Sequence, residues 1–140
     1  MSLRPIFLVV LLCAISVACS SSSEKLTKEI QDANSWIASA RLVAKAYGDG
    51  AVPKGYASDA LKSFNQQLQS TAKRVQSISE PRAPQTAAAL QRAQQAISQI
   101  DESIRREDRI SLGQFDSQLD NEQKQLDTLA NSESDQTPPP

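Results

Sequence analysis

Apolar residues recur every three or four positions in four stretches of this chain, with polar residues between them. Because an α-helix has 3.6 residues per turn, this spacing places the apolar side chains of each stretch on one face of a helix. Gly48 is expected to end the first helix in a left-handed cap. Pro81 and Pro84 break the second helix and can open the third. The four stripes are Leu26, Ile30, Ala33, Ile37, Ala40, Ala44 and Tyr47; Leu61, Phe64, Leu68, Thr71, Val75 and Ile78; Leu90, Ala93, Ile97, Ile100 and Ile104; and Leu112, Phe115, Leu119, Glu122, Leu126 and Leu129.

The boundary between the third and fourth helices is predicted at Ser111. Ser111 and Gln114 have the spacing of a capping box, and Ile110 and Phe115 have that of a hydrophobic staple. These signals favour a new helix that starts at Ser111. The alternative is one unbroken helix through residues 106–110.

Four helices of similar length predict an all-α fold. Each has about 20 to 25 residues and a length of about 30 to 37 Å. Matched helices joined by short connections favour antiparallel neighbours, so residues 25–131 are expected to form an up-down-up-down four-helix bundle. The alternative is a longer three-helix or dimeric coiled-coil arrangement, in which the same stripes face another subunit.

Two polar residues occupy positions on the apolar stripes. Glu122 is expected at the edge of the core, with its stem packed and its carboxylate in water or paired with a basic side chain. The alternative is a buried polar contact between Glu122 and Thr71 that fixes the register of the helices.

The N-terminus is typical of a signal peptide. Arg4 supplies one positive charge, and residues 6–18 form an uncharged, mostly apolar run. As a helix this run would span about 20 Å, which is less than the roughly 30 Å of a bilayer's hydrocarbon layer. Residues 1–18 are therefore predicted to be a signal peptide and not a permanent transmembrane anchor.

The sequence ISVAC at residues 15–19, followed by four serines, resembles the lipobox of bacterial lipoproteins. This resemblance covers only about the first twenty residues. It implies that Cys19 receives the lipid and becomes the mature N-terminus, with residues 19–24 as a serine-rich tether. Ser20 resembles the pattern of lipoproteins sent to the outer membrane, which would place the protein there, facing the periplasm. The alternative is ordinary signal-peptide cleavage after Ala18, which would give a secreted or periplasmic protein.

Composition excludes several classes of function. Without residues 1–18, the 15 Lys and Arg of the chain fall to 14 against 16 Asp and Glu, so no basic surface for nucleic acid is expected. The chain has no histidine, and its only cysteines are Cys13, in the leader, and Cys19. The common general base, nucleophile and transition-metal arrangements are thus missing. We expect no enzyme, no cofactor and no metal, and we expect a disordered tail at residues 132–140.

The connections at the end of the bundle opposite Cys19 hold the candidate partner-binding residues, because loops on a rigid scaffold commonly carry recognition. These candidates are Lys54, Tyr56, Arg105 and Arg109. The alternative is an ordinary turn with Tyr56 packed under the loop.

Trp36 and Leu42 form a second candidate surface, for a partner helix. Trp36 lies beside the first stripe and Leu42 lies opposite it. The sequence thus predicts a lipid-anchored envelope protein whose bundle is a non-enzymatic adaptor or structural module. The alternative is a module that binds a small hydrophobic ligand or lipid between its helices.

Overall fold

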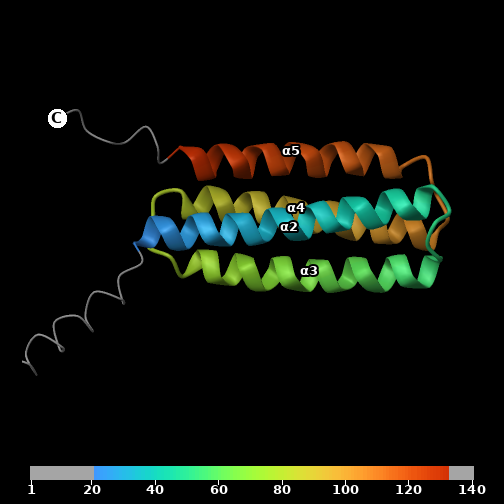
Figure 1. The fold of residues 1–140 in the computed structure, drawn as a ribbon, viewed down its shortest axis with the longest axis horizontal. Helices are drawn as coiled ribbons and strands as arrows, with labels where there is room; N and C mark the ends of the chain where they lie inside the picture. The colour runs from blue at the N-terminus through green and yellow to red at the C-terminus, as the bar shows by residue number, and fades with distance from the viewer. Residues whose placement is uncertain (1–20, 133–140) are drawn as a thin grey trace, which may run out of the picture.

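The computed structural model describes residues 21–132, which form four α-helices and no strand. Consecutive helices run in opposite directions (Figure 1). The all-α, up-down-up-down four-helix bundle is therefore confirmed, and the three-helix alternative is wrong. The predicted signal peptide, Cys19 and residues 133–140 lie outside the described residues. The helices are α2, Ser22–Gly48; α3, Lys54–Gln76; α4, Ala83–Arg105; and α5, Leu112–Asn131.

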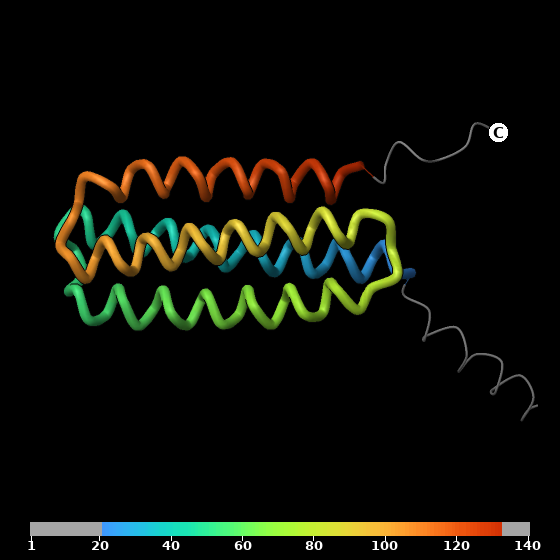
Figure 2. The backbone as a smooth tube through the Cα atoms, turned by 180° about the vertical axis from the view of Figure 1, so that it is seen from behind, coloured from blue at the N-terminus to red at the C-terminus, as the bar shows by residue number. Residues whose placement is uncertain are grey.

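Helices α2 and α4 lie in the middle of the bundle and contact each other (Figures 1 and 2). Helices α3 and α5 lie on opposite sides of this pair, and each packs against both central helices without contacting the other. Small side chains let two helices approach closely. Both central helices bury several alanines, namely Ala33, Ala40 and Ala44 in α2 and Ala89, Ala93 and Ala96 in α4. The cross-section is therefore a rhombus with α2 and α4 on its short diagonal.

The apolar stripes form the core. Full burial of a large apolar side chain stabilises a fold by about 1.5–3 kcal/mol. The rings of Trp36 and Phe64 are partly buried with centroids 6.0 Å apart, so Trp36, expected to face a partner helix, packs against α3 instead. The largest fully buried side chains come from all four helices and are Leu26, Ile30, Ile37, Leu61, Leu68, Val75, Leu90, Ile97, Ile100, Ile104, Leu119 and Leu126.

The first helix begins earlier than the sequence predicted. The Ser21 hydroxyl accepts a hydrogen bond from the Glu24 amide, at 3.2 Å, and so caps the N-terminus of α2. Residues 22–24, expected in the tether, therefore form the first turn of this helix. At the other end of the helix, the prediction that Gly48 forms the left-handed cap was wrong, because Gly48 is still helical. Gly50 takes that conformation, with a φ of 75°.

The connection from α4 to α5 is a true break, so the unbroken-helix alternative is wrong. Glu107 adopts a left-handed φ of 59° just after α4. The N-terminus of α5 lies where it was predicted, but the Ser111 hydroxyl gives no cap and instead donates to Asp108, at 2.6 Å. The Asp108 carboxylate is a stronger acceptor than a serine hydroxyl, and it accepts hydrogen bonds from the amides of Ile110 and Ser111 at 3.1 and 3.3 Å. Ile110 is 94% exposed and forms no staple.

Arg82 closes the end of the bundle where α2 begins and α5 ends, which we call the near end. Its guanidinium pairs with Glu80 at 2.7 Å and donates to the Leu129 carbonyl at 2.6 Å and to the Ser23 hydroxyl at 2.7 Å. The side chain is only 13% exposed. One arginine therefore joins the α3–α4 connection to the ends of two other helices.

Candidate functional site

Two of the predicted partner-binding residues meet at the opposite end of the bundle, which we call the far end. The Lys54 ammonium donates to the Arg105 carbonyl at 3.3 Å and pairs with the Glu107 carboxylate at 3.1 Å. The Arg105 guanidinium in turn pairs with Asp101 at 2.7 Å, and Asp101 also accepts a hydrogen bond from Ser58. Two of the three predicted cations therefore lie on the α3–α4 side, where the carboxylates of Glu107 and Asp101 already compensate their charge.

The other two candidates lie apart from this pair. The Arg109 guanidinium lies over the Tyr47 ring, 5.4 Å from its centroid, next to the seam between α2 and α5. Within residues 21–132 Arg109 forms no ion pair. Tyr56 is 59% exposed, so the alternative that packed it under the loop was wrong. The structure thus divides the predicted cluster and leaves Arg109 as the candidate with an uncompensated charge.

An open groove of about 700 Å³ runs along the α2–α5 seam at the far end. Small residues from both helices leave this space, and Leu42, singled out from the sequence, lies at its edge with 68% of its surface exposed. The groove was missed in the sequence because it depends on which faces of two helices far apart in the chain come together. Its apolar and small lining residues are Ala38, Leu42, Ala44, Gly48, Leu112 and Gly113.

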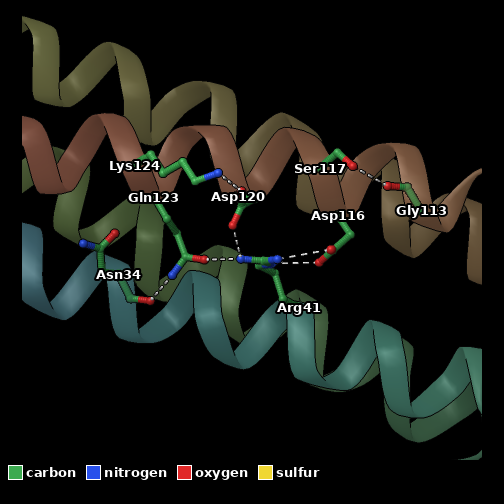
Figure 3. Close-up of polar contacts among 8 residues, drawn as sticks. All are labelled: Asn34, Arg41, Gly113, Asp116, Ser117, Asp120, Gln123 and Lys124. Atoms are coloured by element: carbon green, nitrogen blue, oxygen red, sulfur yellow. Dashed lines mark hydrogen bonds and ion pairs between the residues drawn. The ribbon is translucent and has the colours of Figure 1, made fainter.

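Arg41 bridges the two helices across this groove (Figure 3). Its guanidinium holds both carboxylate oxygens of Asp116, at 2.7 and 3.2 Å, and reaches Asp120 at 2.9 Å and the Gln123 side-chain oxygen at 2.8 Å. The hydrogen bond with Asp116 raises the pKa of Arg41 above its usual value. The pKa of Asp120 is lowered, first by its hydrogen bond with Lys124 and then by Arg41.

Glu122 lies at the edge of the core, as predicted. It is 7% exposed, and one carboxylate oxygen accepts a hydrogen bond from Arg92 of α4 at 2.9 Å. The Thr71 hydroxyl instead accepts from Arg74, at 3.1 Å. Because Thr71 is on α3 and Glu122 on α5, the two helices that do not contact each other, the alternative of a register-fixing pair was wrong.

Residues 21–132 contain no group of three or more metal-ligating side chains suited to a metal ion. In the same region, no helix has both the length and the apolar character needed to cross a bilayer. No protein-family model matches the sequence, and comparison with curated proteins and with solved structures gives no significant match. The site is therefore defined by its geometry alone.

Proposed function

We propose that this chain is a bacterial envelope lipoprotein, anchored through a lipid on Cys19, whose bundle acts as a non-enzymatic adaptor for a protein partner. The anchoring half of the proposal rests on the sequence at residues 15–19 and the serines that follow it. The adaptor half rests on the groove at the far end. In this proposal the protein faces the periplasm from the outer membrane.

The observation that carries the proposal is the separation of the two ends of the bundle. Ser21 caps α2, so only Ser20 separates Cys19 from the start of the helical bundle. The 27 residues of α2 span about 40 Å. The start of α2 and the connection from α4 to α5 lie at opposite ends of the bundle (Figures 1 and 2). The groove is lined in part by Arg109 of that connection, and so belongs to the far end. A lipid on Cys19 would thus hold the near end at a bilayer and direct the groove away from it.

Metabolic labelling with an alkyne fatty acid tests the anchoring. The wild-type chain and the Cys13→Ala variant should both be labelled and found in the membrane fraction, while Cys19→Ala should lose the label. Cys13 is the matched control because it lies within the leader that cleavage would remove. An equally labelled Cys19→Ala chain, or a wild-type chain whose mass includes the leader, would refute lipidation.

Site-specific photocrosslinking in cells tests the adaptor role. A photoreactive residue in place of Leu42, at the groove, should give a discrete crosslinked product that mass spectrometry can identify. The same residue in place of Gln66, an exposed position on α3 away from the groove, is the matched control and should not give that product. Identical products from both positions, or none from Leu42, would contradict the adaptor proposal.

A further inference from the structure

The α2–α5 groove offers its apolar lining to a single extended chain. Between the Arg41 bridge and the far end, its lining runs from Leu42 to Asp49 on α2, a length of about 10 Å along the helix, and faces Leu112 and Gly113 of α5. Helices in contact have axes about 8–10 Å apart, and a helix with its side chains is about 10–12 Å wide. A third helix can therefore lie over this seam without entering it, whereas one unbranched alkyl chain can lie within it.

The groove also has an apolar surface that no side chain of residues 21–132 covers. Ala44 and Leu112, which are 4% and 8% exposed, contribute to its lining, and the exposed Leu42 stands at its edge. Gly113 adds space, since a Cβ atom built there would meet nothing within 4 Å. Covering such a surface with hydrocarbon is favourable in proportion to the apolar area removed from water.

The charges around the groove leave one cation in excess. Arg41 is paired with Asp116, and Lys45 is paired with Asp49 at 2.6 Å. Arg109 has no carboxylate partner in residues 21–132, and its guanidinium is held over the Tyr47 ring. An arginine in this state keeps hydrogen-bond donors that suit a carboxylate, a sulfate or a phosphate.

We propose that this groove binds an anionic amphiphile, a molecule with one alkyl chain and a negatively charged head group. The alkyl chain lies along the apolar lining, and the head group is bound by Arg109. This inference goes beyond the adaptor function and depends neither on the lipid at Cys19 nor on a protein partner.

Isothermal titration calorimetry with dodecyl phosphate, below its micelle concentration, tests the inference. Residues 19–140 with Cys19→Ala are used, because this chain lacks both the lipid and the apolar run at residues 6–18 and can be purified without detergent. One dodecyl phosphate should bind per chain. Dodecyltrimethylammonium, which has the same alkyl chain and the opposite charge, should bind about tenfold or more weakly.

Two pairs of variants, each made in the Cys19→Ala chain, assign the site. Gly113→Trp should fill the groove and abolish binding, whereas Gly55→Trp, at a glycine with equally open space outside the groove, should not. Arg109→Gln should weaken dodecyl phosphate binding about tenfold, and Arg106→Gln should leave it unchanged. Should Gly113→Trp fail to fold by circular dichroism, the arginine pair decides.

Three outcomes would overturn the inference. They are the absence of saturable dodecyl phosphate binding, equal binding of the cationic amphiphile, and equal effects within the arginine pair. A chain that binds no amphiphile but still gives a specific crosslink from Leu42 would assign the groove to a protein partner. The proposed function would then stand while this inference fails.

Discussion

Glu107 occupies a backbone conformation that is normally left to glycine. Within residues 21–132 it is the only residue other than glycine with a positive φ, 59°. The amides of Glu107 and Asp108 bond to the carbonyls of Ile104 and Ser103, at 3.1 and 2.9 Å, which completes a Schellman motif at the end of α4. A left-handed conformation costs a residue with a Cβ atom about 1–2 kcal/mol. The chain tolerates this cost because the motif satisfies two carbonyls of the last turn.

We predict that Glu107→Gly stabilises the protein by about 0.5–1 kcal/mol, because glycine adopts the left-handed conformation without a steric penalty but loses more entropy on folding. The lost ion pair with Lys54 matters little, since both side chains are well exposed. Thermal unfolding followed by circular dichroism measures the change. The control is Glu102→Gly, in the regular part of α4, which should destabilise by about 1 kcal/mol. A lower melting temperature for Glu107→Gly would contradict the prediction.

Single residues were the least predictable part of the candidate site. The sequence indicated that a glycine ends the first helix, but the choice between Gly48 and Gly50 depends on how the last turn closes. The three candidate cations, Lys54, Arg105 and Arg109, were correctly predicted to lie near the far end. However, Lys54 finds its carboxylate 53 positions away, in Glu107, so the sequence could not reveal which cation remains uncompensated.

Among the helices, the most informative contact is the one between α2 and α5. The apolar stripes predicted both helices because the 3.6-residue period appears directly in the sequence. The polar positions that flank the stripes gave no such signal. Nothing in the sequence distinguished Arg41 from the other charged residues. Its partners Asp116, Asp120 and Gln123 become visible only when the two helices lie side by side.

We predict that Arg41 and Asp116 are energetically coupled. Double-mutant cycles of exposed ion pairs give about 0.2–1 kcal/mol, and two-point contact with a partly buried arginine should place this pair at the upper end, near 1 kcal/mol. The measurement is urea unfolding of Arg41→Ala, Asp116→Ala and the double variant. The control is the Lys45–Asp49 pair at the C-terminus of α2, which is more exposed and should show weaker coupling. A coupling no larger than that of the control would contradict this prediction.

For the molecule as a whole, the bundle class followed from the number and length of the stripes, but its cross-section did not. Stripe periodicity does not say which diagonal pair of helices touches. The contact between α2 and α4 explains why Glu122 on α5 pairs with Arg92 on α4 and never reaches Thr71 on α3. The groove escaped prediction for the same reason.

We predict that Arg82→Ala destabilises the bundle by about 2–4 kcal/mol. The substitution removes hydrogen bonds to two helix ends and leaves Glu80, only 13% exposed, without its pairing charge. Urea unfolding measures the loss. Arg106→Ala is the control, because this arginine is 74% exposed and its loss should cost less than about 1 kcal/mol. Equal losses from the two variants would show that Arg82 has no special role at the near end.

The position of Arg82 has one more consequence. Its guanidinium donates to Ser23, near the start of α2, and to the Leu129 carbonyl, near the end of α5. The start of α2 and the end of α5 are therefore close enough for a single guanidinium to contact both. A short glycine-serine linker could therefore connect residue 132 back to residue 21, and the chain could be opened instead between Gly50 and Ala51 in an exposed turn. Such a circular permutant would keep every helix in place while moving both termini to the opposite end.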